Sequence, residues 1–142
     1  MFFILDTDHF SALDRESNAG RKLEKRRSGC GGDLFISIIT VEEVMRGWIA
    51  VLGSCKDPTN EIGIYRRMQR SAELIGQWDV LAWDEESLRR LQILRKQRVR
   101  ISTMDLKIAS IALSHDATVL TRVEAEMARR IVLERPLGGL HR

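Results

Sequence analysis

The chain has 142 residues, which is the length of one domain and leaves little room for a second. Hydrophobic residues make up 44% of it and charged residues 30%, as in an ordinary globular protein with one core. No apolar run approaches the roughly 20 residues that span a bilayer, and Cys30 and Cys55 match no metal or redox spacing. We therefore expect one domain over residues 1–142, in a reducing, cytoplasmic compartment and without a membrane segment.

The net charge is +3, which by itself says little about partners. The distribution is more informative, because arginines gather in four segments, residues 21–27, 66–70, 89–100 and 122–130. Arginine side chains pair well with phosphate oxygens, so a polyanionic partner fits this pattern. For any one segment, a solvated helix face is an equally good explanation.

Apolar periodicity divides the chain into short strands and longer amphipathic helices. In chain order, the first half is predicted to contain a strand at residues 2–5, a basic helix at 19–27, a strand at 34–36, a helix at 41–52, a loop at 53–60 and a helix at 64–75. The second half is predicted to contain a strand at 80–83, helices at 85–97 and 104–115, a strand at 118–120, a short helix at 124–129 and a last strand at 131–133.

Short apolar strands that alternate with amphipathic helices predict an α/β fold. We expect a central, mostly parallel β-sheet of about five strands, flanked by helices on both faces. In open sheets of this kind, the active crevice lies beyond the carboxyl ends of the strands. Acids that directly follow a strand, or that lie in the first turn of the next helix, are therefore the functional candidates.

Several carboxylates fall at this edge of the predicted sheet. Asp6 ends the first strand, Glu43 lies in the first turn of the helix after the second, and Asp105 opens the helix before the fourth. Glu124 and Glu126 come just after the fourth strand. Oxygen-only ligands suit hard cations such as Mg²⁺ or Mn²⁺. Such an ion can hold a scissile phosphate and lower the pKa of an attacking water.

Helix capping offers a structural explanation for some of these acids. Residues 40–43, 102–105 and 121–124 all have the spacing of a capping box, in which the acid bonds to the start of its helix. Taken singly, each of these acids is more often a cap than a ligand. Asp6 follows a buried strand, and no capping spacing explains it. The acids as a set therefore indicate a metal site better than any one of them does.

Three segments resemble, in order, the motifs of the PIN-domain family. Leu5-Asp6-Thr7 after an apolar strand is similar to the opening motif of the family. Residues 36–47 resemble the second motif, a Ser and a Thr followed by a Glu and, four residues on, a Gly. Residues 105–112 and then 117–122 resemble the third block. The match spans essentially the whole chain, whose length is that of the VapC-like toxins, the ribonuclease halves of bacterial toxin–antitoxin pairs.

This resemblance implies a function and a set of roles. The chain would be a metal-dependent endoribonuclease and the toxin of a type II toxin–antitoxin pair. It would hydrolyse RNA phosphodiester bonds with carboxylate-bound Mg²⁺ or Mn²⁺ and an activated water. Asp6, Glu43 and Asp105 would be the catalytic, metal-binding acids, and Thr7 would contact RNA near the phosphate. The resemblance also implies a cognate antitoxin and a homodimer.

The chain departs from the family pattern after Thr121. Val123 stands where the family has an Asn, Glu126 where it has an Asp, and Met127 where it has an aromatic residue. Glu124 and Glu126 point about 200° apart on a helix, so only one can face the other acids. Because Glu124 fits the capping spacing from Thr121, we expect Glu126 to be the fourth metal ligand.

The remaining candidates concern RNA. Arg46, Arg122 and the basic segment at residues 21–27 are expected to contact phosphates. Trp48, Trp78 and Trp83 fall at core-facing or strand-adjacent positions, so they are expected to pack rather than to stack on bases.

Two alternative functions stay open at this point. A PIN-like domain that binds RNA or protein without cutting is compatible with the altered fourth motif, although clustered carboxylates repel one another unless a cation is present. Asp6-Thr7-Asp8 after a strand also fits the start of haloacid-dehalogenase-like phosphatases, with Asp6 as nucleophile and Asp8 as acid/base. Phe10 departs from that pattern, and its later motifs are absent.

Overall fold

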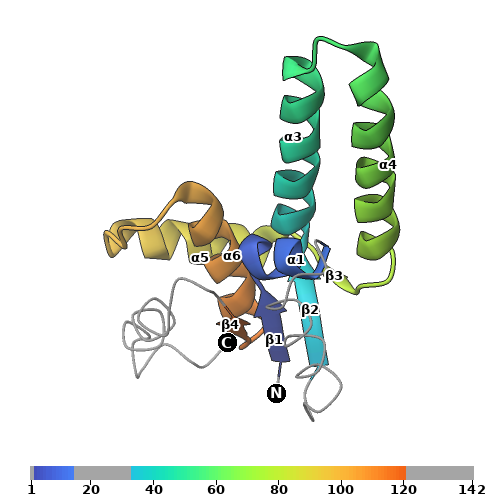
Figure 1. Ribbon diagram of the computed structural model, residues 1–142. Helices are drawn as coiled ribbons and strands as arrows, with labels where there is room; N and C mark the ends of the chain where they lie inside the picture. The colour runs from blue at the N-terminus through green and yellow to red at the C-terminus, as the bar shows by residue number, and fades with distance from the viewer. Residues whose placement is uncertain (1, 15–32, 121–142) are drawn as a thin grey trace.

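The computed structural model describes residues 2–14 and 33–120, in which four strands form one sheet in the order β3-β2-β1-β4 (Figure 1). The strands are β1 (Phe2–Leu5), β2 (Asp33–Ser37), β3 (Val80–Leu81) and β4 (Thr118–Leu120). β1 is central and pairs Phe3 with Leu34 on one side and with Thr118 on the other. The pairings of these four strands are all parallel, so the predicted parallel sheet is confirmed and the strands end at one edge.

Five helices are described in these ranges: α1 (Thr7–Asp14), α3 (Ile38–Ser54), α4 (Pro58–Ile75), α5 (Glu85–Lys96) and α6 (Thr103–Ser114). α3 and α4 run side by side as a hairpin that projects away from the sheet, and α5 and α6 pack along each other (Figure 1). α1 follows β1 directly and lies near the base of the hairpin (Figure 1).

Both faces of the sheet are buried. Neighbouring residues of β1 point to opposite faces, so Ile4 and Leu5 report on one face each. Ile4 lies in one apolar cluster with Ile108 of α6. Leu5 lies in a second cluster with Phe10 of α1 and with Trp78. Parallel sheets need such cover on both faces. The predicted α/β architecture, with helices on both faces of the sheet, is therefore confirmed.

Two helices begin earlier than their apolar stripes predict. α3 begins at Ile38 rather than at residue 41, because Ser37 is its cap and accepts a hydrogen bond from the Thr40 N–H at 3.3 Å. α4 begins at Pro58, inside the predicted loop. Asp57 caps it by accepting the Thr59 N–H at 2.9 Å, and proline suits the first turn of a helix.

Other differences concern short elements. α1 is not predicted by the apolar pattern, and β3 ends at Leu81, two residues before the predicted end. The predicted helices at residues 19–27 and 124–129, and the predicted fifth strand at 131–133, lie outside the described residues. Among the helices that are described, none is long and apolar enough to cross a membrane.

Candidate active site

Asp6 stands where β1 ends and α1 begins. Its backbone carbonyl accepts the Phe10 N–H at 3.1 Å, so Asp6 occupies the capping position of α1. Its N–H donates to the carbonyl of Leu120 at 3.1 Å, and the residue is buried. Asp6 stands at this junction because α1 starts directly after the strand, with no loop between them.

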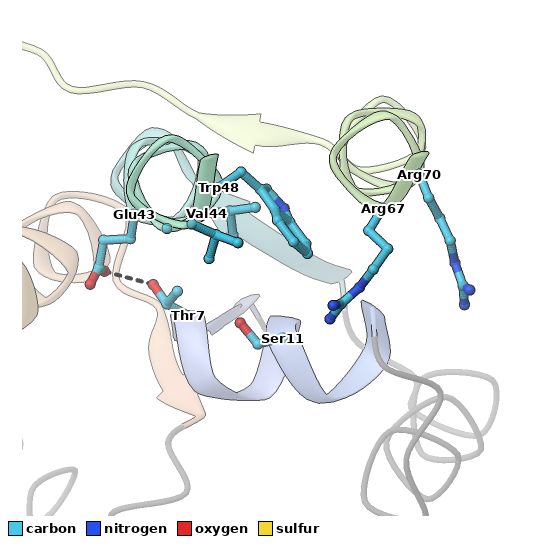
Figure 2. A pocket seen from close by; sticks show the side chains of 9 residues that line it. Thr7, Ser11, Glu43, Val44, Trp48, Arg67 and Arg70 are labelled. Atoms are coloured by element: carbon cyan, nitrogen blue, oxygen red, sulfur yellow. Dashed lines mark hydrogen bonds between the residues drawn. The ribbon is translucent and has the colours of Figure 1, made fainter. Parts of the chain in front are cut away.

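Glu43 is held by a hydroxyl from another helix. The Thr7 hydroxyl donates to Glu43 Oε1 at 2.6 Å and lies 3.2 Å from Thr40 Oγ1 (Figure 2). Since the only hydroxyl hydrogen of Thr7 goes to Glu43, the buried Thr40 donates to Thr7. Glu43 lies in the second turn of α3 rather than the first, and Ser37 rather than Thr40 is the cap. The capping-box interpretation of residues 40–43 is therefore wrong.

Asp105 lies in the first turn of α6, as predicted. Ser102 Oγ accepts the Asp105 N–H at 3.1 Å and donates to Asp105 Oδ2 at 2.8 Å. This reciprocal pair confirms that residues 102–105 cap the helix. A structural role for Asp105 does not exclude a second one, because only one of its carboxylate oxygens takes part.

Glu43 and Asp105 are far apart in sequence but lie within electrostatic range of each other. The pKa of Glu43 is raised above its ordinary value of 4.5, first because burial disfavours the charged form. The hydrogen bond from Thr7 lowers this pKa, while the charges of Asp105, Asp8 and Glu42 raise it. The structure thus adds Asp8 to the acids around Glu43. A cation between these carboxylates would offset their repulsion.

The described residues contain no group of three or more carboxylate, imidazole or thiol side chains placed to hold a metal ion. The chemistry of the donors still fits a hard cation. Glu43 uses Oε1 to bind Thr7 and Asp105 uses Oδ2 to bind Ser102. The second oxygen of each has no hydrogen-bond partner in the described part of the chain. The metal-binding roles of Asp6, Glu43 and Asp105 stay a prediction, as does that of Glu126, which lies outside the description.

A pocket of about 490 Å³ opens beside Glu43, between α1, α3 and α4 (Figure 2). Three helices line it: Thr7 and Ser11 from α1; Glu43, Val44, Gly47, Trp48 and Val51 from α3; Arg67 and Arg70 from α4. The acid is at one end of the pocket and the two arginines are at the other, with Trp48 between them (Figure 2).

The three tryptophans differ in their surroundings. Trp78 is buried and Trp83 packs against the core, as predicted. Trp48 is only half-buried and lines the pocket, so its predicted place in the core is wrong. Its indole N–H donates to Ser71 Oγ at 2.9 Å, and the Arg67 guanidinium carbon lies 4.9 Å from its ring centroid.

The residues predicted to contact RNA are dispersed. Thr7 lies in the site, where it holds Glu43. Arg46 is exposed on α3 and forms an ion pair with Glu42 at 2.7 Å, away from the pocket lining. Arg122 lies outside the described residues. Arg67 and Arg70 belong to the arginine segment at residues 66–70 but were not among the residues predicted to contact phosphates, although their three-residue spacing places them on one helix face.

Comparison with known proteins identifies the family. The PIN domain family model matches residues 3–129, so the chain belongs to the PIN-domain family. No curated protein sequence matches it significantly.

Solved structures share the fold. A chain of VapBC2 from Rickettsia felis, bound to a promoter DNA fragment, has a TM-score of 0.68 at 19% identity, over 91% of this chain and 92% of that one. VapBC-1 from nontypeable Haemophilus influenzae has a TM-score of 0.68 at 24% identity, over 94% and 93%. A toxin–antitoxin complex from Klebsiella pneumoniae has a TM-score of 0.61 at 21% identity, over 84% of each chain. At these identities the likeness establishes the fold.

Proposed function

We propose that this protein is a Mg²⁺- or Mn²⁺-dependent endoribonuclease and the toxin of a type II toxin–antitoxin pair. The observation that carries the proposal is the Glu43 carboxylate, held by Thr7 at the carboxyl edge of a PIN-family sheet and within electrostatic range of Asp105. The similar solved structures include a toxin–antitoxin complex, which supports the choice of this branch of the family.

In this proposal, Asp6, Glu43 and Asp105 hold the metal, with Glu126 as the fourth acid. When bound, the metal supplies the positive charge that holds the scissile phosphate and activates a water. The protein itself supplies orientation. Thr40 donates to Thr7 and Thr7 donates to Glu43, so two hydroxyls fix one carboxylate oxygen. Ser102 fixes one oxygen of Asp105 in the same way.

The partners follow from the same proposal. RNA is the substrate. The expected protein partners are a cognate antitoxin and a second copy of the chain, and the expected compartment is the cytoplasm. The PIN family model covers both Asp6 and Asp8, which favours the nuclease over the phosphatase alternative.

The central experiment measures RNA cleavage with and without metal, in wild type and in variants whose carboxylates are replaced by amides. We expect purified protein to cut RNA with Mn²⁺ and to stop with EDTA, and we expect Asp6→Asn and Asp105→Asn to abolish cutting. Both substitutions keep an oxygen that accepts hydrogen bonds, so circular dichroism should stay native. Glu85→Gln, an exposed acid in the first turn of α5, is the matched control and should cut normally. Undiminished cleavage by Asp6→Asn or Asp105→Asn would contradict the mechanism.

A further inference from the structure

The pocket beside Glu43 extends well beyond the acids. Its α3 lining runs from Glu43 to Val51, which at 1.5 Å per residue is about 12 Å along the helix. The pocket is therefore longer than a single phosphate group. Its volume also lies within the range of about 300–1,000 Å³ that is usual for ligand sites.

The end of the pocket away from Glu43 has the chemistry of a nucleotide site. Arg67 extends from α4 toward Trp48 and Ser11, and Arg70 lies beside it, farther from the acid (Figure 2). Trp48 projects from α3 between the arginines and the acid. Arg67 lies over the Trp48 ring and has no carboxylate partner among the residues that the structure describes. Guanidinium groups pair with phosphates, and both guanidinium planes and aromatic rings stack on unpaired bases.

Gly47 provides the space between the two ends. It lies inside α3, where glycine lowers helix stability relative to alanine. A Cβ atom built at Gly47 meets nothing within 4 Å, so packing does not require a glycine there. A larger side chain at this position would instead project into the open pocket that Gly47 lines.

From these features, and resting on the proposed function, we infer that the pocket binds the RNA strand next to the cut. In this arrangement, the scissile phosphate lies at the Glu43 end. Arg67 binds a phosphate of a neighbouring nucleotide, and an unpaired base stacks on the Arg67–Trp48 pair. Arg67 is then a positioning residue for single-stranded RNA, and it is separate from the acids that carry out hydrolysis.

RNA binding in EDTA tests this inference without metal-dependent cleavage. The probe is a fluorescently labelled single-stranded RNA, titrated at salt concentrations from 50 to 200 mM. We expect Arg67→Gln to weaken binding by about tenfold and to reduce the slope of log K against log salt by about 0.7. Arg66→Gln is the matched control, since it removes the same charge from the next residue of α4 but lies outside the pocket lining. It should weaken binding less than about twofold, as expected for a surface charge outside the site.

A second pair of variants blocks the pocket without changing charge. Gly47→Leu should weaken RNA binding, whereas Gly63→Leu should not, because Gly63 is an open helical position of α4 away from the pocket. Equal effects of Arg66→Gln and Arg67→Gln, or normal binding by Gly47→Leu, would overturn the inference. Normal RNA binding by Gly47→Leu would indicate that the pocket binds a protein segment instead of RNA.

Cleavage with Mn²⁺ separates this inference from the proposed function. Arg67→Gln should raise KM with little change in kcat, because it removes binding that is shared by the substrate and the transition state. A wild-type protein that binds RNA through Arg67 but never cuts it would refute the nuclease and keep the RNA site. A protein that cuts normally with either pocket variant would refute only the RNA site.

Discussion

At Glu43, the proposed chemistry needs an ionised carboxylate that the metal-free fold disfavours. Its carboxylate is partly buried beside Asp105 and Asp8, so its pKa is raised and its charged form is disfavoured in the folded protein. Such a group lowers stability when it ionises: the cost is absent below the ordinary pKa of 4.5 and grows as the pH rises through the higher folded pKa. A protein selected for stability alone would have no use for this arrangement.

This strain gives a prediction for Glu43→Gln. The amide oxygen can still accept the hydrogen bond from Thr7, while the repulsion and the cost of burying a charge disappear. In EDTA at pH 7, the variant should therefore melt at a higher temperature than wild type, and the difference should vanish below about pH 4.5. Thermal melts monitored by circular dichroism across this pH range provide the measurement. A variant that melts lower than wild type at pH 7 would show that Glu43 stabilises the metal-free fold.

At the scale of single elements, helix starts decide how well the sequence predicts the structure. α5 and α6 lie within a residue of their predicted starts, because the first apolar residue of each stripe follows a capping Asp84 or Ser102 within about one helical turn. α3 is missed by three residues because β2 runs into it without a loop, so that Ser37 both ends the strand and caps the helix. α1 is missed for the same reason at Asp6. A strand-to-helix junction without a loop has no turn residues to mark it.

The cap of α5 gives a prediction of pH dependence. Asp84 accepts hydrogen bonds from the Ser87 N–H and hydroxyl, both at 2.9 Å, and these bonds hold its pKa below the ordinary 3.8. A lowered pKa adds stability above pH 3.8, and this stability is lost as the pH falls through the folded pKa. Asp84→Ala should therefore melt lower than wild type at pH 7, and the gap should narrow below pH 3.8. Glu85→Gln, at the next residue, is the control. A gap that is constant with pH would contradict a charge-dependent cap.

At the scale of the whole molecule, strand order is what brings the site together. The sequence predicts parallel strands, and hence a common edge, from the alternation of strands and helices. It does not predict the order β3-β2-β1-β4, because local sequence patterns do not determine which strands pair with each other. The contact between Thr7 and Glu43, the approach of Asp105, and the pocket under the α3–α4 hairpin all depend on that order. Asp6, Thr7, Glu43 and Asp105 were found as candidates from the sequence, but the hydrogen bond from Thr7 to Glu43 and the placement of Arg67 and Arg70 were not.

The last prediction concerns the metal and the whole fold. The acids proposed to hold it come from the start of α1, from α3 and from α6, and no three of the described ones are already gathered around one point. A bound cation would therefore tie three elements together and offset the repulsion at Glu43. Mass action gives about 2.7 kcal/mol at a hundredfold excess over the dissociation constant, which for a domain of this size is a Tm shift on the order of 5 to 10 °C.

Mn²⁺ should produce a shift of this size in wild type and a much smaller one in Asp6→Asn and Asp105→Asn. Glu85→Gln should respond like wild type, because it is an exposed acid away from the site. Differential scanning calorimetry with and without Mn²⁺ measures all four proteins in the same way. Equal shifts in wild type and both Asn variants would mean that the metal binds elsewhere on the molecule. A shift lost only in Asp105→Asn would mean that Asp6 serves as the cap of α1 and not as a ligand.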